Sequence, residues 1–379
     1  MFMRILHVYR TYFPDPPGGI QEAIRQICLA TKNQGFENTV FTLSPAPQPR
    51  ELESLEARII RCRSWAAPAS CDIGDWEAMQ RFAGAAKWAD IIHYHYPWPF
   101  ADILEKIVRP HKPKIMTYHS DIVRQRFTKL VYTPLMHLML NAMTSIVATS
   151  PAYAATSPIL TNPRYKNRVS VIPLGVDKVS YTTDPDKAIL KKLGLESDAP
   201  YFLFLGALRY YKGLKFLIEA AKHVNVPIVI AGSGPAEASL RARAMELGLQ
   251  NVIFARQVSE SEKIALLKAC QAFVLPSHLR SEAFGVVLIE AGMYAKPMIS
   301  CEVGSGTSYA NINEETGFVV PPASPMALAN AMNRLLDKDL ARKFGDAAEK
   351  RYERLFSTGA LGTAYADLYR DMTLKFHPR

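Results

Sequence analysis

Residues 281–290 read Ser-Glu-Ala-Phe-Gly-Val-Val-Leu-Ile-Glu, a loop carboxylate followed by a glycine and an apolar run. They come after a predicted strand at Ala272–Leu275, so we predict that a helix begins near Gly285. The start of a helix presents unpaired N–H groups and a partial positive charge, and glycine lets a ligand approach the backbone closely. The stretch therefore predicts a phosphate-binding site, with Glu282 in the loop before the helix and Glu290 further along it.

Carboxylates accept hydrogen bonds from hydroxyl groups, so Glu282 and Glu290 can bind groups on opposite sides of a diphosphate. The alternative is a surface helix with two incidental glutamates. The pattern resembles the Glu-x7-Glu motif of the retaining, nucleotide-sugar-dependent glycosyltransferases of family 4, which have the GT-B fold. This resemblance covers nearly the whole chain. It implies that Glu282 orients the donor sugar, that Glu290 binds the ribose, and that Phe284 and Gly285 cradle the diphosphate.

The composition limits the partners that the protein can have. A chain of 379 residues predicts two domains, and a formal net charge of +10 suits anionic lipid, anionic substrates or nucleic acid. No zinc-like Cys/His spacing and no low-complexity basic tail occurs, so we do not expect nucleic acid as a partner. The 5 cysteines are scattered, which predicts a reducing, cytoplasmic compartment.

Strands and helices alternate along both halves of the chain, which predicts an α/β protein with doubly wound parallel sheets. We expect two facing Rossmann-like domains with an interdomain cleft, the GT-B architecture. Residues 1–178 are predicted to form an acceptor-binding domain, and 188–359 a nucleotide-sugar-binding domain after a polar linker at 180–187. The resemblance further implies that a last helix, at about 360–379, crosses back to the first domain.

Arg209 and Lys212 lie in the segment 206–213, which follows a predicted strand and opens a helix. Two fixed cations there can stabilise the charge that develops on a leaving diphosphate; the alternative is a solvated basic loop. The family has Arg and Lys at this position as diphosphate ligands, so the resemblance implies catalytic roles for both. We therefore expect no metal ion and no cofactor. The Asp-x-Asp triplets at 184–186 and 337–339 follow no strand, and we expect both to be solvated turns.

Two features of the N-terminal half are also candidates. Gly18 and Gly19 follow the first strand, and His119 follows the predicted strand Ile115–Tyr118. A plain turn and a satisfied core histidine are the alternatives. In the family the glycine loop borders donor and acceptor, and a histidine at this strand end points at the donor sugar, which implies a catalytic role for His119. A tight turn is predicted at Gly232–Pro235, and its role toward a ligand stays open.

The segment Cys301–Tyr309 bears on the identity of the donor. Its Gly-x-Gly-Thr-Ser-Tyr sequence resembles the bacterial O-antigen mannosyl- and rhamnosyltransferases, whose donors are GDP-sugars. The resemblance implies mannosyl transfer from GDP-mannose to a lipid-linked saccharide. The alternatives are a GDP-rhamnose or UDP-sugar donor, or a non-catalytic protein that binds sugar nucleotides. A dehydrogenase is disfavoured because no complete Gly-x-Gly-x-x-Gly follows a strand.

A basic stretch suggests contact with membranes. Residues 109–129 carry six Lys and Arg against one acid, and the apolar stretch Leu130–Leu140 adjoins them. Such a pair can hold a peripheral protein on anionic lipid; the alternative is a half-buried helix with a solvated basic face. Leu130–Ala148 is long enough to span a bilayer, but Pro134 and Asn141 oppose that interpretation. We expect a cytoplasmic protein, peripheral on the inner face of the cytoplasmic membrane.

Overall fold

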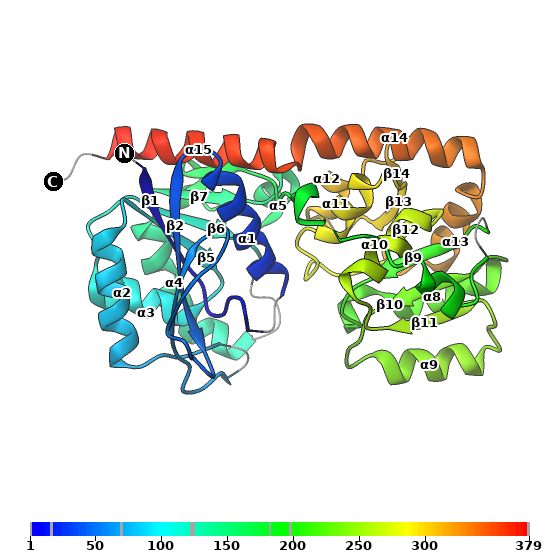
Figure 1. Ribbon diagram of the computed structural model, residues 1–379, viewed down its shortest axis with the longest axis horizontal. Helices are drawn as coiled ribbons and strands as arrows, with labels where there is room; N and C mark the ends of the chain where they lie inside the picture. The colour runs from blue at the N-terminus through cyan, green and yellow to red at the C-terminus, as the bar shows by residue number, and fades with distance from the viewer. Residues whose placement is uncertain are drawn as a thin grey trace. The chain divides into compact units, whose positions relative to one another are not determined.

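The computed structural model describes residues 2–15, 18–68, 71–121, 126–181, 183–196 and 199–376. The chain divides into two compact units (Figure 1). Unit 1 comprises Met1–Asp177 and Thr358–Arg379, and unit 2 comprises Lys178–Ser357. Each unit is α/β with a parallel sheet at its centre, which confirms the predicted fold class.

Unit 1 contains an eight-stranded sheet in the order β3-β4-β2-β1-β5-β6-β7-β8. Its strands are β1 (Met3–Val8), β2 (Phe36–Ser44), β3 (Glu51–Glu53), β4 (Arg58–Arg63), β5 (Ile91–Tyr96), β6 (Lys114–Tyr118), β7 (Ser145–Ala148) and β8 (Val169–Val171). Every pairing is parallel except β3 with β4, which is antiparallel. The sequence did not predict β3, because an edge strand of three residues with two exposed glutamates carries no hydrophobic period.

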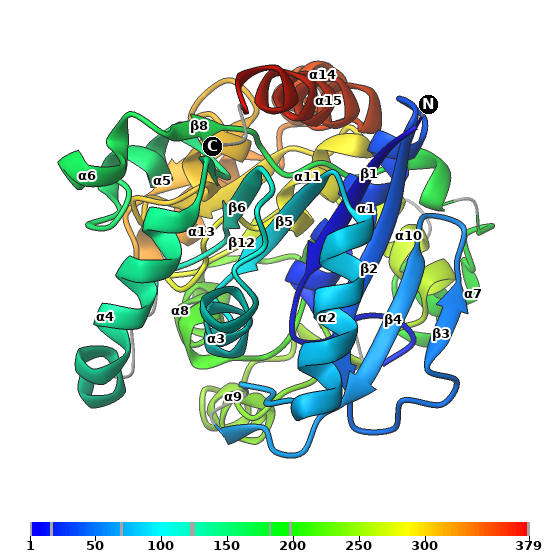
Figure 2. The ribbon, with the colours of Figure 1, turned by 90° about the vertical axis from the view of Figure 1, so that its left-hand side faces the viewer.

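The helices of unit 1 are α1 (Gly19–Lys32), α2 (Trp76–Trp88), α3 (Pro99–Val108), α4 (Arg126–Ala142), α5 (Pro151–Thr156), α6 (Pro163–Lys166) and α15 (Thr358–Lys375). Helix α15 packs against α1 and the sheet, and Figure 2 shows it beside β1 and α1. Leu361, Tyr365 and Tyr369 of α15 share a buried core with Ile27 of α1 and Ile91 of β5. The last helix of the chain therefore completes the core of unit 1.

Unit 2 contains a six-stranded, all-parallel sheet in the order β11-β10-β9-β12-β13-β14. Its strands are β9 (Phe202–Leu205), β10 (Ile228–Ala231), β11 (Val252–Arg256), β12 (Ala272–Leu275), β13 (Met298–Cys301) and β14 (Gly317–Val320). Four of them are fully buried runs of four residues, as expected for strands covered on both faces. The order is that of a Rossmann fold, and it reverses between β9 and β12. Ligands of such sheets bind at the carboxyl ends of the strands beside that reversal.

The helices of unit 2 are α7 (Ala188–Lys192), α8 (Leu214–Ala220), α9 (Glu237–Glu246), α10 (Glu260–Ala269), α11 (Val286–Met293), α12 (Thr307–Ala310), α13 (Pro325–Arg334) and α14 (Lys338–Leu355), with short 3-10 turns η2 (Lys178–Tyr181), η3 (Tyr210–Lys212) and η4 (Ala221–His223). The local sequence determines where several of these helices begin. Ser259 and Glu262 form a reciprocal capping box at α10, and the Asp337 side chain accepts two backbone N–H groups at the start of α14.

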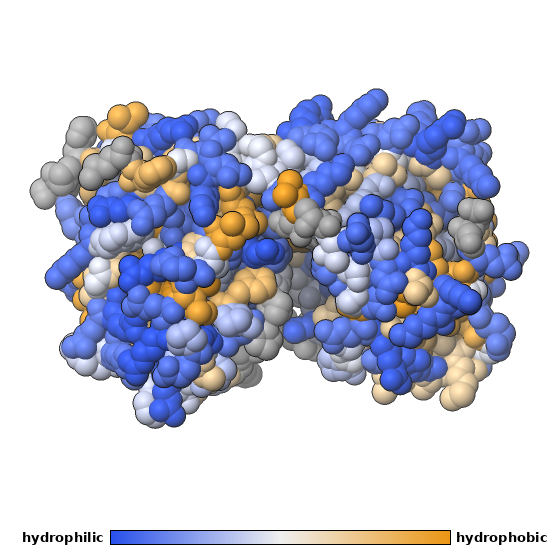
Figure 3. Space-filling model, in the orientation of Figure 1, coloured by the Kyte–Doolittle hydropathy of each residue, from blue (hydrophilic) through white to orange (hydrophobic). Residues whose placement is uncertain are grey.

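Among the described residues, no helix combines the length and the apolar character that crossing a bilayer requires. On the face drawn in Figure 3, hydrophilic side chains cover most of both units, and apolar side chains form separate patches. The basic stretch 109–129, which the sequence analysis assigned to membrane contact, includes residues 122–125, and these lie outside the described residues.

Candidate active site

Four loops meet at the carboxyl ends of the strands in unit 2, around the point where the strand order reverses. The loop after β9 is joined to the loop after β12 by a hydrogen bond from the His278 N–H to the Tyr211 carbonyl, 3.0 Å. It is joined to the loop after β10 by a bond from the Leu208 N–H to the Ser233 carbonyl, 2.9 Å. The loop after β13 joins the loop after β12 through Gly306 N–H and Ala283 carbonyl, 2.8 Å. The sheet thus positions residues distant in sequence in one continuous layer.

Glycine is required where these loops touch. Gly213 has φ of +71°, and a Cβ atom there would lie 1.9 Å from the carbonyl oxygen of Pro276. A Cβ atom at Gly232 would lie 2.0 Å from the carbonyl oxygen of Gly206. The turn at Gly232–Pro235, whose role the sequence left open, therefore serves the packing of one loop on another.

Lys212 and Glu282 form an ion pair at this layer. Nζ of Lys212 lies 2.5 Å from Oε2 of Glu282, and the two side chains are 12% and 10% exposed. Ser277, the second residue after β12, donates its hydroxyl to the same oxygen at 3.0 Å. The Ser305 hydroxyl donates to the backbone carbonyl of Glu282 at 2.6 Å. Removing two charges from water costs free energy, and the hydrogen bond from Ser277 to the carboxylate helps to offset that cost.

Arg209 lies in the same loop as Lys212 but in a different environment. It precedes the 3-10 turn η3, and its backbone carbonyl accepts a hydrogen bond from the Lys212 N–H at 3.0 Å. Its side chain is exposed, so the guanidinium group stays hydrated at the surface of the loop. The pair of predicted diphosphate ligands therefore consists of one exposed cation and one largely buried cation that contacts a carboxylate.

Helix α11 begins at Val286, one residue after Gly285, which has φ of +82° and lies at the N-cap. Phe284 is only 3% exposed, and its ring packs against Phe356 with centroids 6.1 Å apart. Its side chain anchors the loop in the core, so a ligand could reach Phe284 only through the backbone. The eight-residue helix directs its first N–H groups toward the loop that carries Glu282.

Glu290 lies on α11 and is 6% exposed. Its Oε1 lies 3.4 Å from Nζ of Lys263 on α10, and Lys263 also contacts Glu260 at 2.9 Å. Burial lowers the pKa of Lys263, but the carboxylates of Glu290 and Glu260 outweigh burial and leave that pKa raised. Lys263 is therefore a cation that accompanies Glu290. Sequence reasoning missed it, since a lysine on a helix with no motif around it carries no signal.

The remaining predicted site residues belong to unit 1. His119 follows β6, is 5% exposed, and its Nε2 lies 3.0 Å from Nδ1 of His95. Burial lowers the pKa of His119 to about 3, so the ring is neutral near pH 7. Gly18 is the N-cap residue of α1 and Gly19 is its first residue, and both are exposed. The structure therefore brings Arg209, Lys212, Glu282, Phe284, Gly285 and Glu290 together in unit 2, and His119, Gly18 and Gly19 lie in unit 1.

The layer in unit 2 has the chemistry of a site for an anionic ligand that carries hydroxyl groups. Arg209 and Lys212 supply positive charge, α11 supplies N–H groups, and Glu282 and Glu290 can accept hydrogen bonds from hydroxyls. These groups lie where the strand order of the sheet reverses. Sequence reasoning missed Ser277 and Ser305, although Ser277 stands at the end of a buried strand, where polar residues often face a ligand.

Comparisons with known proteins agree with this geometry. Residues 17–179 match the model of Glycosyltransferase Family 4, and residues 185–351 match that of Glycosyl transferases group 1. The chain is 43% identical over 359 residues to the D-rhamnosyltransferase WbpZ of Pseudomonas aeruginosa, covering 94% of this chain and 92% of that protein. It is 38% identical over 368 residues to the O-antigen chain mannosyltransferase C of Escherichia coli, covering 97% and 98%.

Among solved structures, a sucrose-phosphate synthase from Thermosynechococcus elongatus superposes with a TM-score of 0.80 at 26% identity, covering 99% of this chain and 100% of that chain. Anabaena HepE, solved with UDP, has the same fold, with a TM-score of 0.76, 18% identity, and coverage of 97% and 100%. Fold and family models thus define a glycosyltransferase of the GT-B type. The chain belongs to family 4 of the glycosyltransferases, in the branch that contains these rhamnosyl- and mannosyltransferases, and it is a hexosyltransferase.

Proposed function

We propose that the protein is a retaining, metal-independent mannosyltransferase that transfers mannose from GDP-mannose to a lipid-linked saccharide in bacterial O-antigen synthesis. The observation that carries this proposal is the Lys212–Glu282 ion pair at the strand-order reversal, in a chain 38% identical to an O-antigen chain mannosyltransferase over nearly its full length. A cation and a carboxylate held together there suit a ligand that has a diphosphate next to a sugar.

Each group has a role in this reaction. Arg209, Lys212 and the first N–H groups of α11 hold the diphosphate, and Glu282 accepts a hydrogen bond from a sugar hydroxyl. Glu290 accepts hydrogen bonds from the ribose. The bond between the sugar's anomeric carbon and the phosphate oxygen breaks, and the acceptor oxygen bonds to that carbon on the same face. The leaving phosphate oxygen takes the proton of the acceptor hydroxyl, and GDP leaves.

Unit 1 is proposed to bind the acceptor, and its His119 to contact a sugar hydroxyl. The formal charge of +10 also supports contact with anionic lipid, which would place a lipid-linked acceptor close to the protein. The stretch 109–129 is the segment that we propose for this contact, and the inner face of the cytoplasmic membrane is the proposed location.

A second candidate is transfer of D-rhamnose from GDP-rhamnose. The specific observation that favours it is the 43% identity to a D-rhamnosyltransferase over 92% of that protein. A UDP-sugar is a weaker alternative. A non-catalytic protein is disfavoured by the presence of Arg209, Lys212, Glu282 and Glu290 together.

The test is slow donor hydrolysis measured over a panel of GDP- and UDP-sugars. We expect GDP-mannose to be hydrolysed fastest and Lys212→Ala to slow that hydrolysis by about two to three orders of magnitude. Lys222→Ala is a matched control, because Lys222 is an exposed lysine of the same unit that pairs with Glu219 at 3.5 Å. A preference for GDP-rhamnose would establish the second candidate, and a preference for a UDP-sugar would contradict both.

A further inference from the structure

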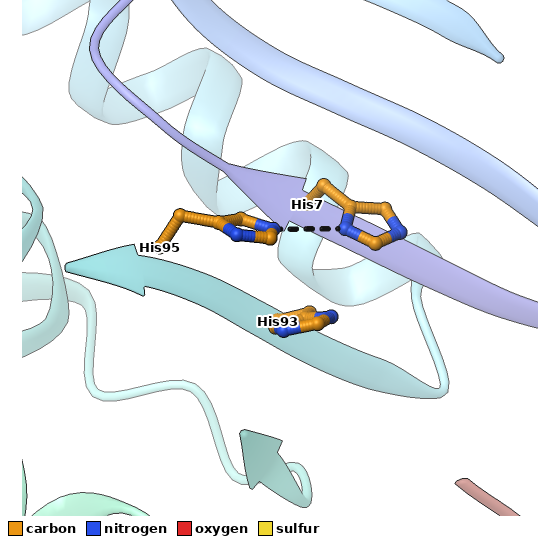
Figure 4. Close-up of side chains that lie close together, drawn as sticks. All are labelled: His7, His93 and His95. Carbon is orange, nitrogen blue, oxygen red and sulfur yellow. Dashed lines mark hydrogen bonds between the residues drawn. The ribbon is translucent and has the colours of Figure 1, made fainter. Parts of the chain in front are cut away.

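A chain of hydrogen bonds runs through the core of unit 1 and ends at His119. Nε2 of His7 lies 3.3 Å from Oδ1 of Asn38, and Nδ1 of His7 lies 3.1 Å from Nε2 of His95. Nδ1 of His95 lies 3.0 Å from Nε2 of His119. Figure 4 shows the middle bond, with His7 on β1 and His95 on the neighbouring strand β5. The exposed fractions of His7, His95 and His119 are 0%, 1% and 5%, so solvent does not replace these bonds.

The donor-to-acceptor direction of these hydrogen bonds is set at Asn38. The amide Nδ2 of Asn38 donates to the Cys28 carbonyl at 3.0 Å and to the Thr31 hydroxyl oxygen at 3.2 Å. A backbone carbonyl can only accept, so Nδ2 faces Cys28 and Oδ1 faces His7. Oδ1 must then accept a hydrogen bond, and Nε2 of His7 must carry the proton.

Neutral histidine has one N–H donor and one acceptor nitrogen, so one assignment fixes the next. With Nε2 of His7 protonated, Nδ1 of His7 accepts from Nε2–H of His95. Nδ1 of His95 then accepts from Nε2–H of His119. Burial lowers the pKa of His7 to about 4 and that of His119 to about 3, and it also lowers the pKa of His95 well below its usual value, which keeps all three rings neutral. His119 is left with Nδ1 as an acceptor.

We propose that Asn38, His7 and His95 form a relay that fixes His119 in one tautomer and presents its Nδ1 as an acceptor for a hydroxyl group of a bound sugar. Among the described residues, none donates a hydrogen bond to that nitrogen, and His119 follows the carboxyl end of β6, the edge where ligands of parallel sheets bind. The sugar as ligand rests on the proposed function. Asn38, His7 and His95 are positioning residues, since they act only through His119.

A metal site is the competing explanation, because ligand nitrogens of His7, His93 and His95 lie within 4.8 Å of one another. Both nitrogens of His93 are, however, bonded to hydroxyl groups: Nδ1 to Tyr369 at 2.8 Å and Nε2 to Thr117 at 2.7 Å. The rings of His93 and His95 are stacked, with centroids 4.4 Å apart and planes 24° apart. Lone pairs lie in the ring plane, so those of two stacked rings do not converge on one ion. His93 is instead hydrogen-bonded to Thr117 of β6 and Tyr369 of α15, outside the relay.

The proposal makes opposite predictions for two substitutions at one position. Glutamine at 95 keeps the polarity of the relay, because its carbonyl can accept from His119 and its amide can donate to His7. Phenylalanine at 95 fills similar space and breaks the relay. His93→Phe is the matched control: His93 is equally buried on the same strand but lies outside the relay. Three measurements are made on each full-length protein: imidazole ¹⁵N spectra, thermal melting, and kcat and KM for donor hydrolysis and for transfer.

In the wild type we expect the His119 signal to report a protonated Nε2 and an unprotonated Nδ1 at every pH above about 5, since its pKa is about 3. His95→Phe should lose that signature and lower kcat by about 10-fold or more, as does loss of the partner that orients a metal-bound histidine. His95→Gln should keep the His119 signature, and its kcat should stay within about threefold of the wild-type value. His93→Phe should lower the melting temperature and leave the His119 signature unchanged.

Three results would overturn the relay: a proton on Nδ1 of His119 in the wild type, wild-type kcat in His95→Phe, or stoichiometric Zn²⁺ that shifts the signals of His7, His93 and His95. A wild-type protein that turns over no sugar nucleotide would contradict the proposed function instead. The tautomer of His119 would still decide the relay in that case, because the ¹⁵N spectra require no substrate.

Discussion

Lys212 and Glu282 contact each other across 70 positions of sequence, with Nζ 2.5 Å from Oε2. From the sequence, the lysine was expected on the diphosphate and the glutamate on the sugar. In the structure the two side chains form one ion pair, and both are nearly buried. A substitution at either position therefore affects stability as well as chemistry.

Lys212→Ala is expected to lower kcat by about two to three orders of magnitude, because it removes a cation from the developing charge on the leaving diphosphate. It should also lower the free energy of unfolding by about 3 kcal/mol, since the Glu282 carboxylate loses its partner. Arg209→Ala should lower kcat similarly but change that free energy by less than about 0.5 kcal/mol, because Arg209 is exposed. Donor hydrolysis and urea unfolding measure the two effects. Equal stability losses in the two variants would contradict the buried pair.

Glu290→Gln and Glu282→Gln should separate nucleotide binding from transfer. We expect Glu290→Gln to weaken GDP binding, because Glu290 is assigned to the ribose, and Glu282→Gln to lower kcat with little change in GDP affinity. Calorimetric titration of GDP and steady-state kinetics on the same samples measure both. If Glu282→Gln lost GDP affinity and Glu290→Gln kept it, the two roles would be reversed.

Activity is expected to survive EDTA, because Arg209, Lys212 and the start of α11 can neutralise a diphosphate. In each of the two Asp-x-Asp triplets a carboxylate binds backbone N–H groups. Oδ1 of Asp186 accepts a hydrogen bond from the Ala188 N–H. Oδ1 of Asp337 accepts hydrogen bonds from the Asp339 and Leu340 N–H groups at the start of α14. Asp337→Ala should lower the free energy of unfolding by about 1 kcal/mol and leave kcat unchanged. Loss of activity on chelation, restored by Mg²⁺ or Mn²⁺, would show that a metal ion takes part.

The stretch 109–129 is expected to bind vesicles that contain anionic lipid. Each Lys or Arg near such a surface contributes about 1 kcal/mol, and added salt screens the attraction. Changing Arg124, Arg126 and Lys129 together to Glu should abolish co-flotation at low salt and spare donor hydrolysis. Flotation that persists in the triple variant would assign the contact to another surface.

The order of strands and helices was predictable because most strands of both units are short buried runs between turn residues, as in Phe202–Leu205 and Ala272–Leu275. Strand β3 was not predictable, since its pairing depends on β4 and not on a hydrophobic run of its own. The start of the helix after Gly285 was predicted to within one residue, because a glycine stands between a loop and an apolar run, and in the structure this glycine is the N-cap with positive φ.

Contacts between distant residues could not be predicted from one sequence. Lys212 contacts Glu282 only because β9 and β12 are neighbours in the sheet. The order of strands in a sheet cannot be predicted from the local sequence of each strand. His7, His95 and His119 come from three neighbouring strands or strand ends, with no motif between them. His93 and His95 are two apart in a strand and so lie on the same face, which indicates that histidines gather there but not that His95 pairs with His7 and His119.

Retaining mannosyl transfer is tested most directly by the structure of the product formed from GDP-mannose and a lipid-linked saccharide acceptor, determined by NMR. We expect mannose to be transferred with the same anomeric configuration as in the donor, and Lys212→Ala to form product about two to three orders of magnitude more slowly under the same conditions. An inverted anomeric configuration, or undiminished product formation by Lys212→Ala, would contradict the proposed mechanism.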